Sequence, residues 1–412
     1  MKKFNIPNYY RSSFITQIKE ARKITDPRKK DFLPTLLDFG SVRFFIARHF
    51  GFCYGVENAV EIAYKALEEN PNKRVFLLSE MIHNPTVNLD LQSKGIHYIM
   101  DNLGNQLVDW SDISDKDIVV TPAFGTTVAI ENQLKAIGIL PQTYNATCPF
   151  VEKVWKKSHK LGEKDYTVVV HGKPNHEETR ATFSHAQEQA PTVIVQNMAQ
   201  TLLLADVILG KVDKSLFYGL FENQYSAGFD VDKDLDRIGV VNQTTMLASD
   251  TRAISETLKQ AIIQKFGVSH YKDYFADTSD TLCYATEDNQ SATIGLLDAV
   301  GDACDFAIVV GGYNSSNTAH LVELCEQKLP TFYISDAQAI ESQRVISHFD
   351  YETKKHLKTN DFIPQKAVVN IVLTSGASCP DTMVDAVLDK LLGYFPDAKS
   401  KESVLKTVLE TS

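Results

Sequence analysis

The stretch IVVGGYNSSNTAHLVE, residues 308–323, contains the arrangement that decides the fold. A short apolar run typical of a buried strand ends in two glycines, and a polar turn then leads into residues with helical spacing. The same order recurs in LLSEMIHNPTVN (77–88) and in VVVHGKPNHEETRA (168–181). Strands that alternate with helices in this way are typical of parallel sheets with crossover helices. The sequence therefore predicts an α/β protein.

A cysteine precedes each of these three strands at a similar distance and lies at the start of a helix-like stretch. The sequences around them are HFGFCYGVENAV, YNATCPFVEKVW and SDTLCYATEDNQSA. The polar turns follow by 30, 28 and 31 residues, and each unit then has a second strand that ends in small or hydroxyl residues. This agreement indicates a weak internal repeat with domain-sized periods. The cysteines are Cys53, Cys148 and Cys283, and the turn residues at those intervals are His83, His176 and Asn314.

The repeat predicts three α/β domains related by a pseudo-threefold arrangement, preceded by an N-terminal arm. Ligand groups gather beyond the carboxyl ends of parallel strands, so the three units could direct their cysteines and polar turns at one central site. The predicted divisions are an arm at 1–40 and domains at 41–147, 148–280 and 281–412. The expected strands are 42–47, 75–78, 118–121, 168–170, 238–241, 306–310 and 368–373, and the expected helices are 57–69, 151–161, 250–266 and 318–327.

Composition excludes several classes of protein. The 412 residues are 43% hydrophobic and 23% charged, which is ordinary for a globular chain and argues against disorder. The net charge is −10 and no long basic run occurs, so we expect small molecules or proteins as partners rather than nucleic acid. No apolar stretch reaches the roughly 18 residues that a membrane helix needs, and the N-terminus lacks the apolar centre of a secretory signal. Six cysteines are too sparse for a disulfide framework, which favours a reducing cytoplasm. The N-terminus is only weakly similar to a transit peptide and is interpreted as an amphipathic arm, so we expect a cytoplasmic rather than a plastid protein.

The three repeat cysteines permit two kinds of metal site. Convergent thiolates can hold zinc with an open fourth position, or a 4Fe-4S cluster in which one iron has no protein ligand. Cys304 and Cys325 are expected to be small buried core residues. Cys379, in SGASCP, closes a strand without sharing the repeat position and is expected to lie beside the site.

Two polar segments could act on a ligand. HGKPNHEETR brings together His171, His176, Glu177 and Glu178 as a possible proton-donor group, although the two acids could equally stabilise a helix N-terminus. GGYNSSNTAH predicts an anion site for a phosphate or diphosphate, because its glycines allow close approach and a helix begins directly after it. A capping turn is the alternative there, but it needs only one such residue. The polar residues of this second segment are Asn314, Ser315, Ser316, Asn317 and Thr318.

Eight motifs between about residue 43 and residue 390 together resemble one family. They are GFCYGV, MIHNPTVN, ATCPFVEKVW, HGKPNHEET, NQTTML, TLCYAT, GGYNSSNT and TSGASCPD. In this order they resemble the 4-hydroxy-3-methylbut-2-enyl diphosphate reductases, the IspH or LytB family. The resemblance implies reductive removal of the hydroxyl of (E)-4-hydroxy-3-methylbut-2-enyl diphosphate. The products would be isopentenyl and dimethylallyl diphosphates, in the last step of the methylerythritol phosphate route to isoprenoids.

The resemblance also assigns roles to particular residues. It implies one 4Fe-4S cluster with three cysteine ligands and one open iron, around which three domains are arranged. The implied ligands are Cys53, Cys148 and Cys283, and Glu178 would be the proton source. The residues implied to bind or orient the substrate are His83, His176, Thr244, Asn314, Ser315, Ser316, Asn317 and Ser378.

The chain departs from the family pattern at two places. Many bacterial members have a second diphosphate-binding histidine in an Ala-His-Gly segment, where this chain has Phe124. The family's His-Pro-Glu reads His176, Glu177, Glu178 here, and both differences are similar to the plant and cyanobacterial branch. The resemblance implies a ferredoxin or flavodoxin type of electron donor and a monomer or homodimer. Lys173 or Thr126 could then hold the diphosphate in place of the missing histidine.

Three other functions use some of the same residues. A non-redox iron-sulfur dehydratase would use the open iron only as a Lewis acid. An iron-sulfur carrier or redox sensor would need no residues that bind a substrate. A zinc hydrolase would use the thiolates to hold zinc instead of a cluster. The combination of an anion tract, an acid and three rather than four cysteines favours the reductase, because a carrier usually has protein ligands on all four irons.

Overall fold

The computed structural model describes residues 4–28, 30–276 and 281–411. The predicted boundary at residue 280, residues 1–3 and 29 of the predicted arm, and residue 412 of the predicted third domain lie outside the described residues. The chain forms two compact units. Unit 1 takes its residues from 1–57, 83–87 and 284–412, and unit 2 from 58–82 and 88–283.

Unit 1 is built on a five-stranded sheet in the order β1-β2-β14-β10-β11. All neighbouring pairs are parallel except β1 and β2. The central strands are almost wholly buried, as expected for a sheet covered by helices, and their apolar runs explain why they form strands. The strands are β1 (Thr35–Asp38), β2 (Val42–Ile46), β10 (Phe306–Val310), β11 (Thr331–Ile334) and β14 (Val369–Ser375), with an antiparallel ribbon of β12 (Val345–Asp350) and β13 (Lys355–Asn360).

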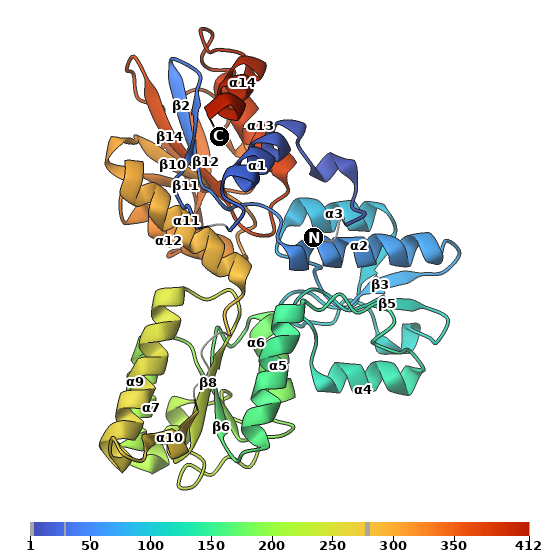
Figure 1. Cartoon of the computed structure of the whole chain (residues 1–412). Coiled ribbons are helices and arrows are strands. Elements are labelled where there is room, and N and C mark those ends of the chain that lie inside the picture. Colours follow the sequence, from blue (N-terminus) through green and yellow to red (C-terminus); the bar gives the residue numbers. More distant parts are fainter. Residues whose placement is uncertain (1–3, 29, 277–280, 412) are drawn as a thin grey trace. The chain divides into compact units, whose positions relative to one another are not determined.

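The helices of unit 1 include one from the predicted N-terminal arm. The helix α1 (Ser13–Thr25), blue in Figure 1, packs on α13 (Asp381–Leu392) and α14 (Lys401–Thr411), drawn in red. Apolar side chains of all three helices share one core cluster with β2, β10 and β14. The helices α11 (Tyr284–Val300) and α12 (Ser316–Glu326) pack on β2 and on β10 and β11, respectively. The N-terminal segment is therefore part of the packed core of unit 1.

Unit 2 contains two parallel sheets, ordered β4-β3-β5 and β7-β6-β8-β9. The strands β6 and β8 are buried at every position, so helices must cover both of their faces. The strands are β3 (Val75–Leu77), β4 (Ile96–Tyr98), β5 (Ile118–Val120), β6 (Thr167–His171), β7 (Thr192–Val195), β8 (Ile238–Asn242) and β9 (Phe275–Ala276). The helices are α2 (Tyr54–Glu69) and α3 (Pro85–Ser93), both of which begin in unit 1, with α4 (Val128–Ile137), α5 (Pro149–Gly162), α6 (Glu177–Ala186), α7 (Met198–Ile208), α8 (Phe217–Leu220), α9 (Ala248–Phe266) and α10 (Tyr271–Tyr274).

All seven predicted strands and all four predicted helices are present, and the predicted α/β class with several parallel sheets is confirmed. One pairing could not be foreseen. The strand β2, which the repeat suggests as the start of a first domain, pairs in parallel with β14 of the C-terminal segment. The division into three domains stays a prediction. Among the helices that the structure describes, none has the length and apolar character needed to cross a membrane.

Candidate functional site

Each of the three repeat cysteines lies directly before a helix, as predicted. Cys53 precedes α2, Cys148 is the N-cap residue of α5, and Cys283 precedes α11. All six cysteines of the chain are described, and none of them forms a disulfide. The positive end of a helix favours a thiolate, which is the form that binds metal. This donor set suits a soft metal centre such as an iron-sulfur cluster.

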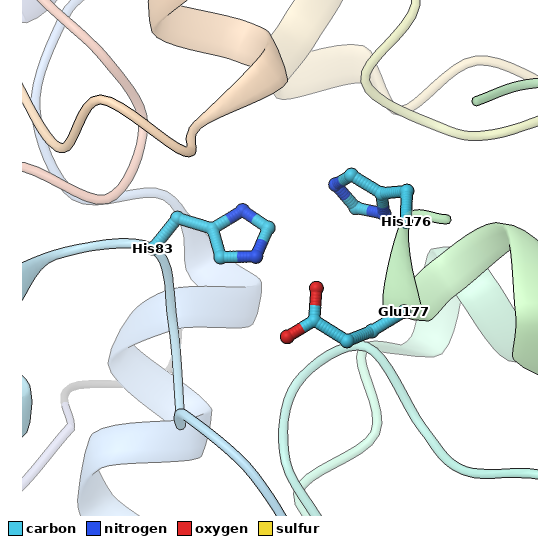
Figure 2. A group of neighbouring side chains, drawn as sticks. All are labelled: His83, His176 and Glu177. Atoms are coloured by element: carbon cyan, nitrogen blue, oxygen red, sulfur yellow. The ribbon is translucent and has the colours of Figure 1, made fainter. Parts of the chain in front are cut away.

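The buried acid of unit 2 lies in the first turn of α6. His176 caps this helix through Nδ1, which accepts a hydrogen bond from the backbone N–H of Glu178 at 3.2 Å. Figure 2 shows the side chains of His176 and Glu177 leaving the N-terminal end of this helix. Glu178 is only 1% exposed, and its Oε1 accepts a hydrogen bond of 2.5 Å from the backbone N–H of Thr244. The carboxyl group therefore has a fixed position, which a simple helix-dipole role would not require.

A continuous series of contacts in unit 2 connects this acid to two of the cysteines. The backbone N–H of Cys283 donates to the carbonyl of Thr244 at 3.2 Å, directly beside the Glu178 contact. The backbone N–H of Cys148 donates to the carbonyl of Ala123 at 2.9 Å. Next to Ala123, the ring of Phe124 packs edge-on against the ring of His176, with centroids 5.7 Å apart and planes at 85°. Unit 2 thus brings together Cys148, Cys283, His176, Glu178 and Thr244.

The buried side chain of Gln243 supports the turn before α6. Its Oε1 accepts hydrogen bonds from the backbone N–H of Lys173 at 3.2 Å and from the hydroxyl of Thr179 at 3.0 Å. A Cβ at Gly172 would lie 2.5 Å from the Thr179 hydroxyl oxygen, so this position needs glycine. The side chain of Gln243 therefore binds the motif HGKPNHEET near both of its ends.

The segment around Phe124 is held by an aromatic pair that the sequence did not reveal. Trp155 of α5 stacks on His185 of α6, with ring centroids 3.8 Å apart, and His185 Nε2 lies 3.1 Å from the carbonyl oxygen of Thr126. Gly125 has φ +76°, and a Cβ there would lie 2.4 Å from the Trp155 ring. Helical spacing alone can only suggest whether Trp155 and His185 lie in the core or at the surface. Their stacking, which supports the Phe124 segment, becomes apparent only because α5 packs on α6.

Lowering the pH is expected to destabilise the chain through His185. Burial lowers the pKa of His185 despite the nearby carboxylates of Glu131 and Glu188. Below about pH 6.5 the unfolded histidine is protonated, whereas the folded one takes up its proton only at lower pH, so stability falls as pH decreases through this window. Urea unfolding at a series of pH values should give a shallower dependence for His185→Phe than for wild type. Equal dependences would contradict this assignment.

The candidate residue Thr126 lines a cavity within unit 2. The cavity has a volume of about 290 Å³, and Glu177 and Arg180 also line it. Thr126 itself is buried, with 7% of its surface exposed. Thr126 therefore borders a partly open pocket. Its predicted contact with a diphosphate stays a prediction, as does that of Lys173.

The polar turn of unit 1 begins α12 and is almost completely enclosed. Ser315 caps the helix, because its hydroxyl oxygen accepts from the backbone N–H of Thr318 at 3.2 Å. Asn317 Oδ1 accepts from the backbone N–H of Ala377 at 2.9 Å, and Asn317 Nδ2 is buried without a partner among the described residues. Ser316 is 3% exposed, whereas the side chain of Asn314 is exposed. The capping alternative therefore accounts for Ser315 but not for Asn317.

Two more candidate residues adjoin this turn in unit 1. The hydroxyl of Ser378 donates to the carbonyl of His83 at 2.9 Å, and both residues are buried. A Cβ at Gly312 would lie 2.5 Å from that same carbonyl oxygen, so glycine lets the His83 segment approach the turn. The backbone N–H of Cys53 donates to the carbonyl of Ala377 at 3.1 Å. Unit 1 thus brings one candidate ligand next to the candidate anion-binding residues.

Of the three remaining cysteines, Cys325 is as expected and Cys304 is not, and the position of Cys379 beside the site stays a prediction. Cys325 is fully buried as predicted, and burial raises its pKa to about 12. Cys379 is also fully buried, in the apolar core of unit 1, with a pKa raised by burial to about 12. Cys304 was expected in a core but is only partly buried, because it ends the short turn before β10.

Comparison with known proteins places the chain in a family. The sequence pattern of the LytB protein family matches residues 44–392. This chain belongs to the LytB family. The membership confirms the resemblance of the eight motifs. The matched residues belong to both units and include the three repeat cysteines, Glu178 of α6 and the polar turn of α12.

Relatives of this LytB-family chain include cyanobacterial and chloroplastic proteins. A 4-hydroxy-3-methylbut-2-enyl diphosphate reductase of Picosynechococcus sp. is 36% identical over 391 residues, which are 93% of this chain and 94% of that protein. A chloroplastic protein of the same name from Botryococcus braunii is 38% identical over 357 residues, which are 85% of this chain and 69% of that protein. The solved structure of the E-1-hydroxy-2-methyl-but-2-enyl-4-diphosphate reductase from Plasmodium falciparum has a similar fold, with a TM-score of 0.61 and 22% identity over 89% of this chain and 98% of that one.

Proposed function

We propose that this chain is a 4-hydroxy-3-methylbut-2-enyl diphosphate reductase, an iron-sulfur oxidoreductase of the non-mevalonate isoprenoid pathway. It would convert (E)-4-hydroxy-3-methylbut-2-enyl diphosphate to isopentenyl and dimethylallyl diphosphates. The observation that carries the proposal is the buried Glu178 carboxylate, held by the backbone of Thr244, whose carbonyl in turn holds Cys283. An enclosed acid beside a candidate metal ligand suits proton delivery to a substrate at that metal. The reductase relatives, which match over most of the chain, support the same reaction.

The proposed cofactor is one 4Fe-4S cluster held by Cys53, Cys148 and Cys283. Each thiol lies at a helix N-terminus, where backbone N–H groups and the helix dipole favour the thiolate. Burial raises the pKa of the Cys53 thiol, whereas the backbone N–H groups of Gly55 and Val56 lower it. Such a cluster supplies electrons and, at an iron without a protein ligand, a Lewis acid.

The proposed role of Glu178 is to donate the proton that the departing hydroxyl needs. The Glu178 carboxyl group is only 1% exposed, and one of its oxygens accepts a hydrogen bond from the backbone N–H of Thr244, so the group is held in one place. His176 holds the first turn of α6 through its cap, and Phe124 packs against the His176 ring. We therefore assign proton delivery to Glu178 and its orientation to His176 and Thr244.

The proposed binding residues for the diphosphate are those of unit 1. Backbone N–H groups at the start of α12 and the buried amide of Asn317 provide donors for an anion, and the helix dipole favours negative charge there. The buried His83 and Ser378 adjoin the same turn. Because Asn314 is exposed, we expect its contribution to be smaller than that of Asn317.

Asn317→Asp is expected to raise KM for the diphosphate substrate by about tenfold or more, since a buried donor becomes an acceptor that repels the anion. Aspartate can still accept the backbone N–H of Ala377, so the turn itself should persist. Asn314→Asp is the matched control, because it adds the same charge three residues away on an exposed side chain. Steady-state kinetics and inhibition by inorganic pyrophosphate would measure both variants. Equal KM changes in the two variants would exclude a specific contact with Asn317.

One experiment separates the reductase from the three alternatives. The protein would be purified without oxygen, its iron and sulfide counted, and hydroxymethylbutenyl diphosphate supplied with a reduced viologen. Consumption of electrons with formation of both isoprenyl diphosphates supports the proposal. A dehydratase would turn over without consuming electrons, a carrier or sensor would hold a cluster without converting the substrate, and a zinc hydrolase would contain no sulfide.

The electron donor and the compartment are further proposals. We expect a ferredoxin or flavodoxin type of donor, and either a monomer or a homodimer. We also keep the expectation of a cytoplasmic protein, although a chloroplastic relative exists. Reduction of the purified enzyme by a ferredoxin system and sedimentation would test the donor and the oligomeric state.

A further inference from the structure

Lys19 of α1 contacts the loop that carries Cys53. We call residues 50–53 the Cys53 loop. The Lys19 ammonium donates to the carbonyl oxygen of Phe50 at 2.9 Å and to Asp381 Oδ1 at 2.6 Å. It also lies 4.2 Å from the centre of the Phe50 ring, within the range of a cation–π interaction. One ammonium group therefore connects three segments that are far apart in the sequence.

The ion pair is partly shielded from water. The side chain of Lys19 is 28% exposed, and that of Asp381 is 15% exposed. Asp381 is the first residue of α13, where the helix dipole stabilises a negative charge. The dipole of α13 thus stabilises the Asp381 carboxylate. Through its ion pair with Lys19, this carboxylate also fixes the ammonium group that donates to the Phe50 carbonyl of the Cys53 loop.

The path of the Cys53 loop follows this ion pair closely. Gly51 has φ +75°, and a Cβ there would lie 2.7 Å from Asp381 Oδ1 and 2.9 Å from Lys19 Nζ. Only glycine lets the backbone turn so near the pair without a clash. The loop is therefore shaped around the Lys19–Asp381 contact, and that shape sets where Cys53 lies directly before α2.

Other contacts from the N-terminal segment flank the same loop. The ring of Tyr10 lies 5.8 Å from that of Phe52, and the ring of Phe4 lies 4.9 Å from that of Tyr54. On the other side, the backbone N–H of Cys53 donates to the carbonyl of Ala377. Of these contacts, the one made by Lys19 joins a charged group to the backbone of the loop.

We propose that Lys19 is a positioning residue for the metal ligand Cys53, acting through its paired contacts with Asp381 and the Phe50 carbonyl. The inference rests on the proposed function only in that Cys53 binds the cluster. Removing the ammonium would free the loop carbonyl and leave the partly buried Asp381 carboxylate without its cation. The loop would then sample other conformations, and the Cys53 thiolate would leave the cluster more often.

The test compares Lys19→Met with Lys401→Met in the full-length chain. Lys401 is the control, because it also pairs with carboxylates of α13: with Asp385 at 2.5 Å, where the side chains are 23% and 21% exposed, and with Asp389 at 2.5 Å. Its ammonium also lies over an aromatic ring, that of Phe14, at 5.0 Å. Both substitutions therefore remove ion pairing between a lysine and α13 in unit 1, and Lys401→Met removes one pair more, but only Lys19→Met removes a contact with the Cys53 loop.

The measurement is the rate at which a ferrous chelator removes iron from the holoprotein in the absence of oxygen. The loss of iron is monitored through the visible absorbance of the cluster. Lys19→Met is expected to release iron about tenfold faster than wild type, because residues that hold a metal ligand in place typically change metal retention by that much or more. Lys19→Arg is expected to release iron as slowly as wild type. Lys401→Met should behave as wild type, although thermal unfolding of the apoprotein should change similarly in the two methionine variants.

Equal release rates for Lys19→Met and Lys401→Met would overturn the proposal, as would fast release from Lys19→Arg. If Lys19→Met does not fold, Asp381→Asn takes its place, since it removes the charge that holds Lys19. A wild-type protein that takes up no cluster would instead count against the proposed function, so the two failures are distinguishable.

Discussion

Glu178→Gln is expected to lower turnover by about 10²-fold or more, while iron and sulfide content and substrate affinity stay near those of wild type. The amide keeps the size of the side chain and can still accept the backbone N–H of Thr244 through its oxygen. It cannot donate a proton as an acid does. Anaerobic steady-state assays with reduced viologen would measure kcat, and substrate binding would be measured separately.

Glu177→Gln is the matched control for this prediction. Glu177 is the neighbouring carboxylate on α6 and is also buried, at 8% exposed. Its side chain lines the cavity with Thr126 and Arg180, whereas it is Glu178 that accepts the hydrogen bond from Thr244. We expect a change in kcat of at most a few fold. A larger loss in Glu177→Gln than in Glu178→Gln would transfer the proton-donor role to Glu177.

Replacing any one of Cys53, Cys148 and Cys283 by alanine is expected to abolish turnover and to leave little or no cluster. An iron that loses its only protein ligand is no longer held in place, so the cluster becomes labile. Iron and sulfide analysis after anaerobic reconstitution would measure this loss. The effect should be equally large for all three positions, because the proposal gives each cysteine one iron.

The other cysteines provide the controls. Cys325→Ala removes a small buried side chain and is expected to cost about 1 kcal/mol of stability while the cluster is retained. Cys379→Ala, in the core of unit 1, should also retain the cluster. Complete cluster loss in Cys379→Ala, with a normal cluster in one of the three repeat variants, would show that the ligand set is wrong.

Much of the local structure could be predicted from the sequence. The runs around Val168, Ile238 and Phe306 are apolar and bounded by turn residues, and each forms a strand within two residues of its expected limits. The cysteines were correctly expected at helix starts, because Pro149 after Cys148 and the helical spacing after Cys53 and Cys283 are local signals. Such features depend on neighbours in the chain, which the sequence displays directly.

The supports of the site could not be predicted in the same way. Trp155 stacks on His185 only because α5 packs on α6, and Lys19 reaches Phe50 only because α1 packs on α13. The pairing of β2 with β14 joins residues more than 300 positions apart. No periodicity reports which distant partner a strand or a side chain will choose.

The sequence by itself determined the α/β class, the positions of the strands and helices, the three repeat cysteines and membership of the LytB family, because these rest on local patterns and ordered motifs. Tertiary structure alone decided that Glu178 is buried against Thr244, that Asn317 is enclosed while Asn314 is exposed, and that the N-terminal helix contacts the Cys53 loop. Burial and long-range contacts arise only when remote segments pack together, and that packing converts a list of polar residues into groups with defined neighbours.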